Sequence, residues 1–125
     1  DGQRITPVVD YGQGASTSRL ISAASNNATV AKASAGRVLA VSVNNLNAAA
    51  RYLKLYNKAT TPAPATDNAL LRLVIPLAAS SADHLAFPGG VKFASGSSYA
   101  LVTGIRATDH TSVAASEHVV NIVFD

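Results

Sequence analysis

The most regular alternation of apolar and polar residues lies in the middle of the chain, at residues 51–58 (RYLKLYNK). The two leucines of this segment fall on one face of an extended chain, and its two tyrosines and first lysine fall on the other. A period of two is typical of a half-buried β-strand, because successive side chains point to opposite sides of a sheet. A second apolar run occupies residues 38–43 (VLAVSV), and we expect the two runs to form a central β-hairpin joined by residues 44–50.

Most of the remaining chain consists of short segments of strand-like composition that are separated by turn residues. We expect further strands at residues 19–24, 28–32, 69–77, 91–93, 98–105 and 118–124. Pro62 and Pro64 lie in residues 59–68, which carry no periodicity and predict a long surface connection. The Pro-Gly-Gly sequence at residues 88–90 predicts a turn, and residues 80–85 are the best candidate for a turn of helix.

About eight short strands with so few helix signals predict an all-β protein, in which a single antiparallel β-sandwich follows an extended N-terminal arm. Both a jelly roll and an immunoglobulin-like sandwich fit this pattern, because periodicity does not reveal how the strands are connected. We assign residues 1–18 to the arm and a loop, and residues 19–125 to the sandwich domain. The alternation predicts that the following apolar side chains point inward: Leu39, Val41, Leu53, Leu55, Leu71, Leu73, Leu101 and Ile122.

The composition is poor in charge and rich in small neutral residues. Charged residues make up 14% of the chain, against roughly 25% in a typical soluble domain. Alanine, serine, threonine and asparagine take their place, with 24, 13, 9 and 8 residues. A surface of small neutral side chains costs little to desolvate and little side-chain entropy to order, so it suits permanent packing against neighbours. Drift in an alanine-rich genome would give the same composition without any such role.

The formal net charge of +3 comes from ten basic and seven acidic residues, and the basic ones are scattered along the chain. No basic run is present, so the sequence does not support nucleic-acid binding, although the mild positive charge favours an acidic partner surface. No apolar run approaches the ~20 residues that a membrane-spanning helix needs. The chain has no cysteine, which excludes disulfides and thiolate metal sites.

The titratable residues form no recognisable catalytic pattern. The seven carboxylates fall mostly in predicted loops or at strand ends, and none is paired at a spacing that would place two in one cleft. Asp83-His84 and Asp109-His110 are neighbours in sequence, so in a strand their side chains point apart. His110 and His118 could meet across a hairpin, but no metal-ligand motif supports such a site, and the chain lacks a Gly-x-Ser-x-Gly nucleophile elbow. We therefore expect no catalytic, cofactor-binding or metal-binding residues, and a protein that is not an enzyme.

The polar face of residues 51–58 is the first candidate for a binding surface. Tyr52 and Tyr56 share this face with Lys54, and together with Tyr99 they are the aromatic candidates for a platform on which a sugar or a base stacks. The competing interpretation is an amphipathic stripe that packs on a second sheet or on a neighbouring subunit. Under either interpretation we expect these residues of the strand to contact a partner or a second layer.

The N-terminal arm offers a second candidate for partner binding. Residues 1–18 contain few large apolar side chains, so they have little to bury against an ordering entropy of roughly 1–2 kcal/mol per residue. Residues 5–9 (ITPVV) nevertheless have strand propensity, and such a segment can pair with an exposed sheet edge of another chain. We predict that the arm is ordered by another chain and mobile in the free monomer. The predicted partner-binding residues are Ile5, Pro7, Val8, Val9, Tyr11, Tyr52, Lys54 and Tyr56.

Several short motifs follow one another in a fixed order between Arg37 and Phe124. They are residues 50–59 (ARYLKLYNKA), a connection rich in Pro, Thr and Asp, an apolar strand ending at Ile75-Pro76, residues 87–93 (FPGGVKF), Gly96, Tyr99, Thr103-Gly104, a polar stretch at residues 109–113 and a final strand. In this order the chain resembles a group of small structural proteins of tailed bacteriophages. The resemblance does not extend to the first part of the chain, and it carries no catalytic residues.

The resemblance implies a non-enzymatic, β-rich virion component. It looks more like a head decoration (cement) protein, which binds the outer capsid surface and stabilises the head, than like a tail module. The implied partners are the major capsid protein and neighbouring copies of the chain, as a homo-oligomer such as a trimer, with no direct contact to nucleic acid or membrane. Such a protein is made in the cytoplasm of the host bacterium and ends on the capsid surface of the virion. The alternative is a β-sandwich module of the tail or baseplate that binds a host glycan.

Overall fold

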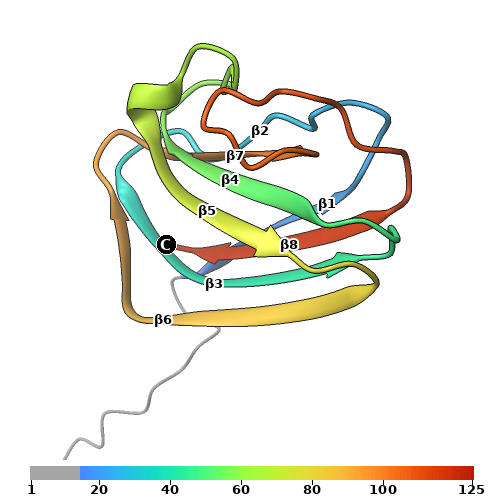
Figure 1. Ribbon diagram of the computed structural model, residues 1–125. Coiled ribbons are helices and arrows are strands. Elements are labelled where there is room, and N and C mark those ends of the chain that lie inside the picture. Colours follow the sequence, from blue (N-terminus) through green and yellow to red (C-terminus); the bar gives the residue numbers. More distant parts are fainter. Residues whose placement is uncertain (1–14) are drawn as a thin grey trace, which may run out of the picture.

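A computed structural model describes residues 15–125, which fold into eight β-strands and one turn of 3-10 helix, η1 (Asn68–Leu70) (Figure 1). The strands are β1 (Ser16–Ile21), β2 (Thr29–Lys32), β3 (Gly36–Asn45), β4 (Arg51–Asn57), β5 (Leu71–Leu77), β6 (Ser81–Phe93), β7 (Ser97–Val102) and β8 (His118–Phe124). The predicted all-β sandwich of about eight strands is confirmed. Within the described residues, no helix is long and apolar enough to span a membrane.

The strands form two four-stranded antiparallel sheets that pack face to face (Figure 1). The first sheet has the order β1-β8-β3-β6, and the second sheet has the order β2-β7-β4-β5. Only β4 and β5 are neighbours both along the chain and within a sheet, and every other connection crosses to the opposite sheet. Two four-stranded sheets interleaved in this way are a jelly roll. The immunoglobulin-like alternative is wrong, because that fold pairs its strands in a different order.

The predicted central hairpin is also wrong, because β3 and β4 lie in different sheets. Each strand has one apolar face, and placing the two strands on opposite layers lets both faces meet in the interior. Asn45, which is 1% exposed, holds the crossing connection in place. Its side-chain amide donates hydrogen bonds to the carbonyls of Ala49 (3.0 Å), Leu77 (3.2 Å) and Ala78 (3.1 Å).

The hydrophobic core lies between the two sheets, as the alternation predicts. It is made of Val38, Val41, Val43, Leu53, Leu55, Ile75, Leu77, Phe93, Tyr99, Leu101, Val113, Val120 and Ile122. Five of the eight predicted inward residues belong to it, and Leu73 packs against it. Leu39 and Leu71 do not, and for Leu39 the cause is a β-bulge between Val38 and Ala40. A bulge adds one residue and reverses the alternation, so Val38 points inward instead.

Strand β6 replaces three predicted features. Of the expected turn of helix at residues 80–85, all but Ser80 lie within this single strand, together with the expected turn at residues 88–90 and the short strand after it. The register pairs Ala40 with Ala86 and Val38 with Val91, so one residue of β3 faces four of β6. Gly89 and Gly90 have φ angles of +78° and +79°, which glycine adopts easily. The glycines therefore form a large bulge at which β6 bends sharply, while the strand stays paired with β3 on both sides of the bend (Figure 1).

The first and last described strands begin and end close to the predicted residues. β8 begins and ends where the sequence predicts, at residues 118–124. β1 begins at Ser16, so three residues assigned to the arm belong to the first sheet. Residue 15 directly precedes β1, and residues 1–14 of the assigned arm lie outside the described residues.

Candidate partner-binding surfaces

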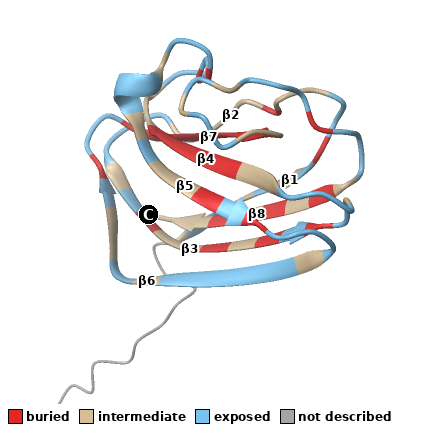
Figure 2. Cartoon of the chain, viewed as in Figure 1, coloured by how far each residue is buried: buried red, intermediate tan, exposed pale blue. Residues whose placement is uncertain are grey.

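The outer face of the second sheet is covered by two connections of the chain itself (Figures 1 and 2). Residues 58–70 join β4 to β5, and residues 103–117 join β7 to β8. The outward residues of β4 and β7 are consequently buried: Lys54, Tyr56, Ser98, Ala100 and Val102 are all at most 1% exposed. The predicted partner surface on β4 is therefore closed over its C-terminal half.

Lys54 anchors the connection at residues 103–117. Its ammonium group donates hydrogen bonds to the main-chain carbonyls of Arg106, Ala107 (3.3 Å) and Asp109 (3.1 Å). The Asp109 carboxylate in turn accepts hydrogen bonds from the Gly104 N–H (2.9 Å) and the Thr111 hydroxyl (3.0 Å). Burial lowers the pKa of Lys54, and the Asp109 carboxylate opposes this effect. Lys54 therefore binds the chain's own backbone, which corrects its predicted contact with a partner.

Tyr56 lies fully buried at the other end of the same face. Among the described residues its hydroxyl has no hydrogen-bond partner, and burial raises the pKa of Tyr56 to about 12. The connection at residues 58–70 is closed by an ion pair of 2.6 Å between Lys58 and Asp67. Pro62 and Pro64 are buried, so this connection packs onto the domain instead of running over its surface as predicted. Tyr56 is thus not available to a partner, and its predicted contact is wrong.

The three tyrosines do not form the predicted stacking platform. Tyr99 is 1% exposed and belongs to the core, where its hydroxyl lies 2.9 Å from the Ser18 hydroxyl. In the register of β7 and β4, Tyr99 lies beside Leu55, whose side chain points into the core. Tyr99 therefore points to the opposite side of the sheet from Tyr56. Tyr52 is half-buried and is the one predicted strand residue that keeps some exposure.

The other predicted partner-binding residues belong to the N-terminal arm. They are Ile5, Pro7, Val8, Val9 and Tyr11, and all of them lie outside the described residues. Their contact with another chain stays a prediction.

The outer face of the first sheet is a different kind of surface, which we call the open face. No segment of residues 15–125 covers it (Figures 1 and 2). The strand registers place twelve side chains there: Thr17, Arg19, Ile21, Ala40, Ser42, Asn44, Ala82, His84, Ala86, Val119, Asn121 and Val123. One arginine and one histidine are its titratable residues, and Ile21 is 60% exposed. The open face is therefore flat, nearly neutral and built from small side chains.

The edge of the first sheet at β6 carries a feature that opposes pairing with another strand. Residues 82–86 are all exposed (Figure 2). The register places Asp83 beside Val43, on the inward side of the edge strand. An inward-pointing charge on an edge strand discourages edge-to-edge pairing, because the pairing would bury it. The face of this sheet is consequently a better contact surface than its β6 edge.

A third surface collects positive charge at the end of the sandwich where β8 ends. We call it the basic rim and define it by Lys32 of β2, Arg37 of β3, Arg72 of β5 and Lys92 of β6. Arg72 is placed there by a hydrogen bond of 2.8 Å from its Nε to the Lys92 carbonyl. A shallow hollow of about 440 Å³ lies within the rim, and its lining residues are Lys32, Ala35, Gly36, Arg37, Lys92 and Asp125.

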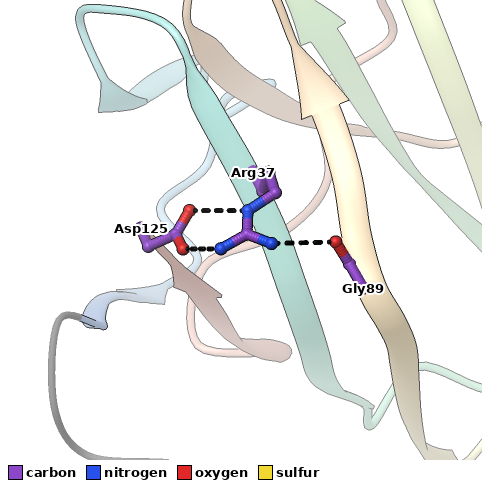
Figure 3. Close-up of polar contacts among 3 residues, drawn as sticks. All are labelled: Arg37, Gly89 and Asp125. Carbon is purple, nitrogen blue, oxygen red and sulfur yellow. Dashed lines mark hydrogen bonds and ion pairs between the residues drawn. The ribbon is translucent and has the colours of Figure 1, made fainter.

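Arg37 is held in a fixed position within the basic rim (Figure 3). Its guanidinium donates two hydrogen bonds to the Asp125 carboxylate and one of 3.1 Å to the Gly89 carbonyl. This pairing lowers the pKa of Asp125 and raises the pKa of Arg37. Sequence reasoning missed the rim because its members lie up to 60 residues apart and only the jelly-roll order brings them together.

The histidines do not share a site. His118 is fully buried between the sheets, His84 lies on the open face, and His110 is exposed in the connection at residues 103–117. Both ring nitrogens of His118 lack a hydrogen-bond partner among the described residues, and burial lowers the pKa of His118. Within residues 15–125, no three His, Cys, Asp or Glu side chains are grouped so that they could hold a metal ion.

Comparisons of the chain with protein-family models, with curated proteins and with solved structures identify no match. The function is therefore inferred from the jelly roll, its surfaces and the order of motifs in the sequence.

Proposed function

We propose that this chain is a non-enzymatic structural protein of a tailed-bacteriophage virion, which decorates the outer surface of the capsid and stabilises the head. The observation that carries the proposal is the open face, a whole sheet surface that the described chain leaves uncovered. The jelly roll and the sequence resemblance support the same function. The partners are the major capsid protein and neighbouring copies of the chain in a homo-oligomer.

The chemistry of the open face suits permanent contact. Its small side chains lose little rotamer entropy when they are fixed, and half of the twelve are apolar, with one arginine as the only lysine, arginine, aspartate or glutamate among them. A face with many lysines and glutamates would have to desolvate those charges first. When the open face binds another protein surface, little of the favourable free energy of burial is therefore offset by desolvation and side-chain ordering.

The size of the open face favours a function that uses many copies. Four strands spaced ~4.8 Å apart, each contributing about six residues of ~3.3 Å rise, cover roughly 400 Å² of flat area. A standard interface buries roughly 800 Å² on each partner, so one such contact is weak by itself. Copies that also touch one another on a shell bind with high effective concentration. Binding to the assembled shell then stabilises it by mass action.

The N-terminal arm supplies the second contact in this proposal. Residues 5–9 pair with a neighbouring subunit, and removal of residues 1–11 leaves the fold intact but weakens binding to capsids. Circular dichroism checks the fold, and co-sedimentation with capsids measures the binding. Unfolding of the truncated protein, or unchanged occupancy on the particle, would contradict this part of the proposal.

Cryo-microscopy of assembled particles tests the function directly. The informative variant is Ala82→Glu with Ala86→Glu, which adds two charges to exposed positions of the open face. The matched control is Ala114→Glu with Ala115→Glu, which adds the same charges to exposed positions in the connection over the second sheet. We expect the first variant to lose its density on the capsid and the second to keep it.

Two results would overturn the proposal. One is density for the chain in the tail or baseplate only, and the other is absence of the chain from the virion. The glycan-binding alternative has lost its main structural argument, because Tyr52, Tyr56 and Tyr99 do not share an exposed face.

A further inference from the structure

The basic rim brings four of the ten basic residues of the chain together at one end of the sandwich. Counting side chains alone, its four cations exceed the one carboxylate, that of Asp125, by three charges. Like charges held together in this way create a positive potential that attracts anionic groups. Among the described residues, neither Lys32 nor Lys92 forms an ion pair that would cancel this potential.

We propose that the basic rim is a docking site for an acidic segment of a partner protein, whose aspartate or glutamate side chains contact Lys32, Arg72 and Lys92 together. This site goes beyond the proposed function, since it lies at the end of the sandwich and not on the open face. Its test needs only the purified chain, so it can succeed or fail independently of the capsid.

Gly36 lines the hollow at a point where the chain is closely packed, with the Lys32 side chain and the Asp125 carbonyl beside it. A Cβ atom at this position would lie 2.2 Å from the Asp125 carbonyl oxygen and 2.9 Å from the Lys32 ammonium nitrogen. Arg37 and Asp125 exchange main-chain hydrogen bonds of 3.3 and 3.0 Å beside it. Because the Arg37 guanidinium is already occupied by Asp125 and Gly89, it forms a fixed wall of the hollow. The contacts to a partner are left to the other three cations.

The chemistry of the rim favours several carboxylates over one phosphate or a nucleic acid. Lys32 and Lys92 come from different sheets and act as separate point charges, and exposed ion pairs of this kind are individually weak. A ligand therefore has to contact several of them at once, which a run of acidic side chains does. The lining of the hollow contains no aromatic side chain on which a nucleic-acid base could stack.

A peptide of ten glutamates is the probe for this site. Its binding to the purified chain is measured by fluorescence anisotropy, and the contacted residues are mapped by amide chemical shifts. The rim variant is Lys32→Gln with Lys92→Gln. The matched control is Arg19→Gln with Arg106→Gln, which removes the same charge from exposed positions elsewhere. Thermal unfolding of both variants verifies that they fold.

In the unmodified chain we expect the peptide to change the amide chemical shifts of the rim residues. In the rim variant we expect the affinity for the peptide to fall about two- to thirty-fold, which corresponds to the loss of two exposed ion pairs. The control should lose less than the rim variant. Binding should weaken as the Debye length falls from about 30 Å at 0.01 M salt to about 8 Å at 0.15 M. Absence of saturable binding at low salt, equal losses in both variants, or tighter binding of a polyphosphate of equal charge would each overturn the proposal.

Discussion

The two sheets of this sandwich have the same number of strands but opposite outer faces. The second sheet is covered by the chain's own connections, and its outward lysine and tyrosine are buried. The first sheet has no such cover among the described residues: its outward residues are exposed on the edge strands β1 and β6 and of intermediate burial on most of β8 and β3. The alternation of apolar and polar residues does not distinguish the two, because a strand pattern describes which residues share a face and not what covers that face.

The lengths of the connections explain the difference. The two long ones, residues 58–70 and 103–117, both start from strands of the second sheet and fold back over it. The remaining connections are short, and none of them reaches across the outer face of the first sheet. A buried lysine on the second sheet is tolerated because the covering loop supplies carbonyl acceptors for its ammonium group.

The largest expected effect is on the covered face. Tyr56→Ala should lower the free energy of unfolding by about 3–5 kcal/mol, because it removes a fully buried aromatic side chain. Leu55→Ala, on the core side of the same strand, should cost about 2–5 kcal/mol. Denaturant titration of the isolated domain measures both values. A loss below about 1 kcal/mol for Tyr56→Ala would mean that the connection at residues 58–70 does not seal this face.

The anchor of the other covering connection should have the next largest effect. Lys54→Met keeps most of the side-chain volume but removes the ammonium donor from three partly buried carbonyls, so we expect a loss of about 1–3 kcal/mol in unfolding free energy. Limited proteolysis should also cut residues 103–117 faster. Lys92→Met is the control at an exposed site, where substitutions usually change stability by about 0.5 kcal/mol or less. Equal stability of the two variants would contradict the anchoring role.

The stability of the fold should decrease in mild acid because His118 is buried between the two sheets. Burial lowers the pKa of His118; the nearby Glu117 carboxylate opposes this shift to a smaller extent, and the Arg51 guanidinium adds to it. Below the ordinary value of 6.5, the unfolded chain takes up a proton that the folded chain does not, so stability should fall as the pH decreases from there. Three carboxylates with lowered pKa values add a separate loss only near and below 3.8: Asp67, Asp109 and Asp125.

His118→Leu isolates this contribution. We expect the unfolding free energy of the variant to be nearly independent of pH between the ordinary histidine pKa of 6.5 and the ordinary aspartate pKa of 3.8, where the unmodified chain loses stability. His84→Leu, which removes a histidine from the open face, is the control. A slope that survives in His118→Leu would assign the acid sensitivity to another group.

The smallest effect on stability should come from the open face. Ile21→Ser changes an apolar residue that is 60% exposed, and we expect a change of at most about 0.5 kcal/mol. The same substitution should weaken binding to capsids if this face is the contact surface. Thermal unfolding and co-sedimentation separate the two readouts, and a large loss of stability would show that the face is packed after all.

Periodicity was sufficient for the fold class, for most strands and for most of the core, because these depend on local alternation. It did not predict the bulges, because neither the extra residue at Leu39 nor the four residues of β6 around Gly89 can be recognised from the alternation of apolar and polar residues. It also failed for β3 and β4, because alternation is the same whether two strands pair in one sheet or face each other across a core. The basic rim and the burial of Lys54 depend on contacts between distant segments, which no local pattern contains.

The strand order of the first sheet also sets the moment at which the protein can fold during its synthesis. β8 is the last of the described strands in chain order, yet it lies between β1 and β3, and within residues 15–125 it alone joins β1 to the rest of its sheet. While the ribosome adds residues at about 5–20 per second, β1 must wait several seconds for this partner. A nascent chain that ends before β8 exposes one side of β3 and all of β1, so premature termination yields an aggregation-prone fragment rather than a smaller domain.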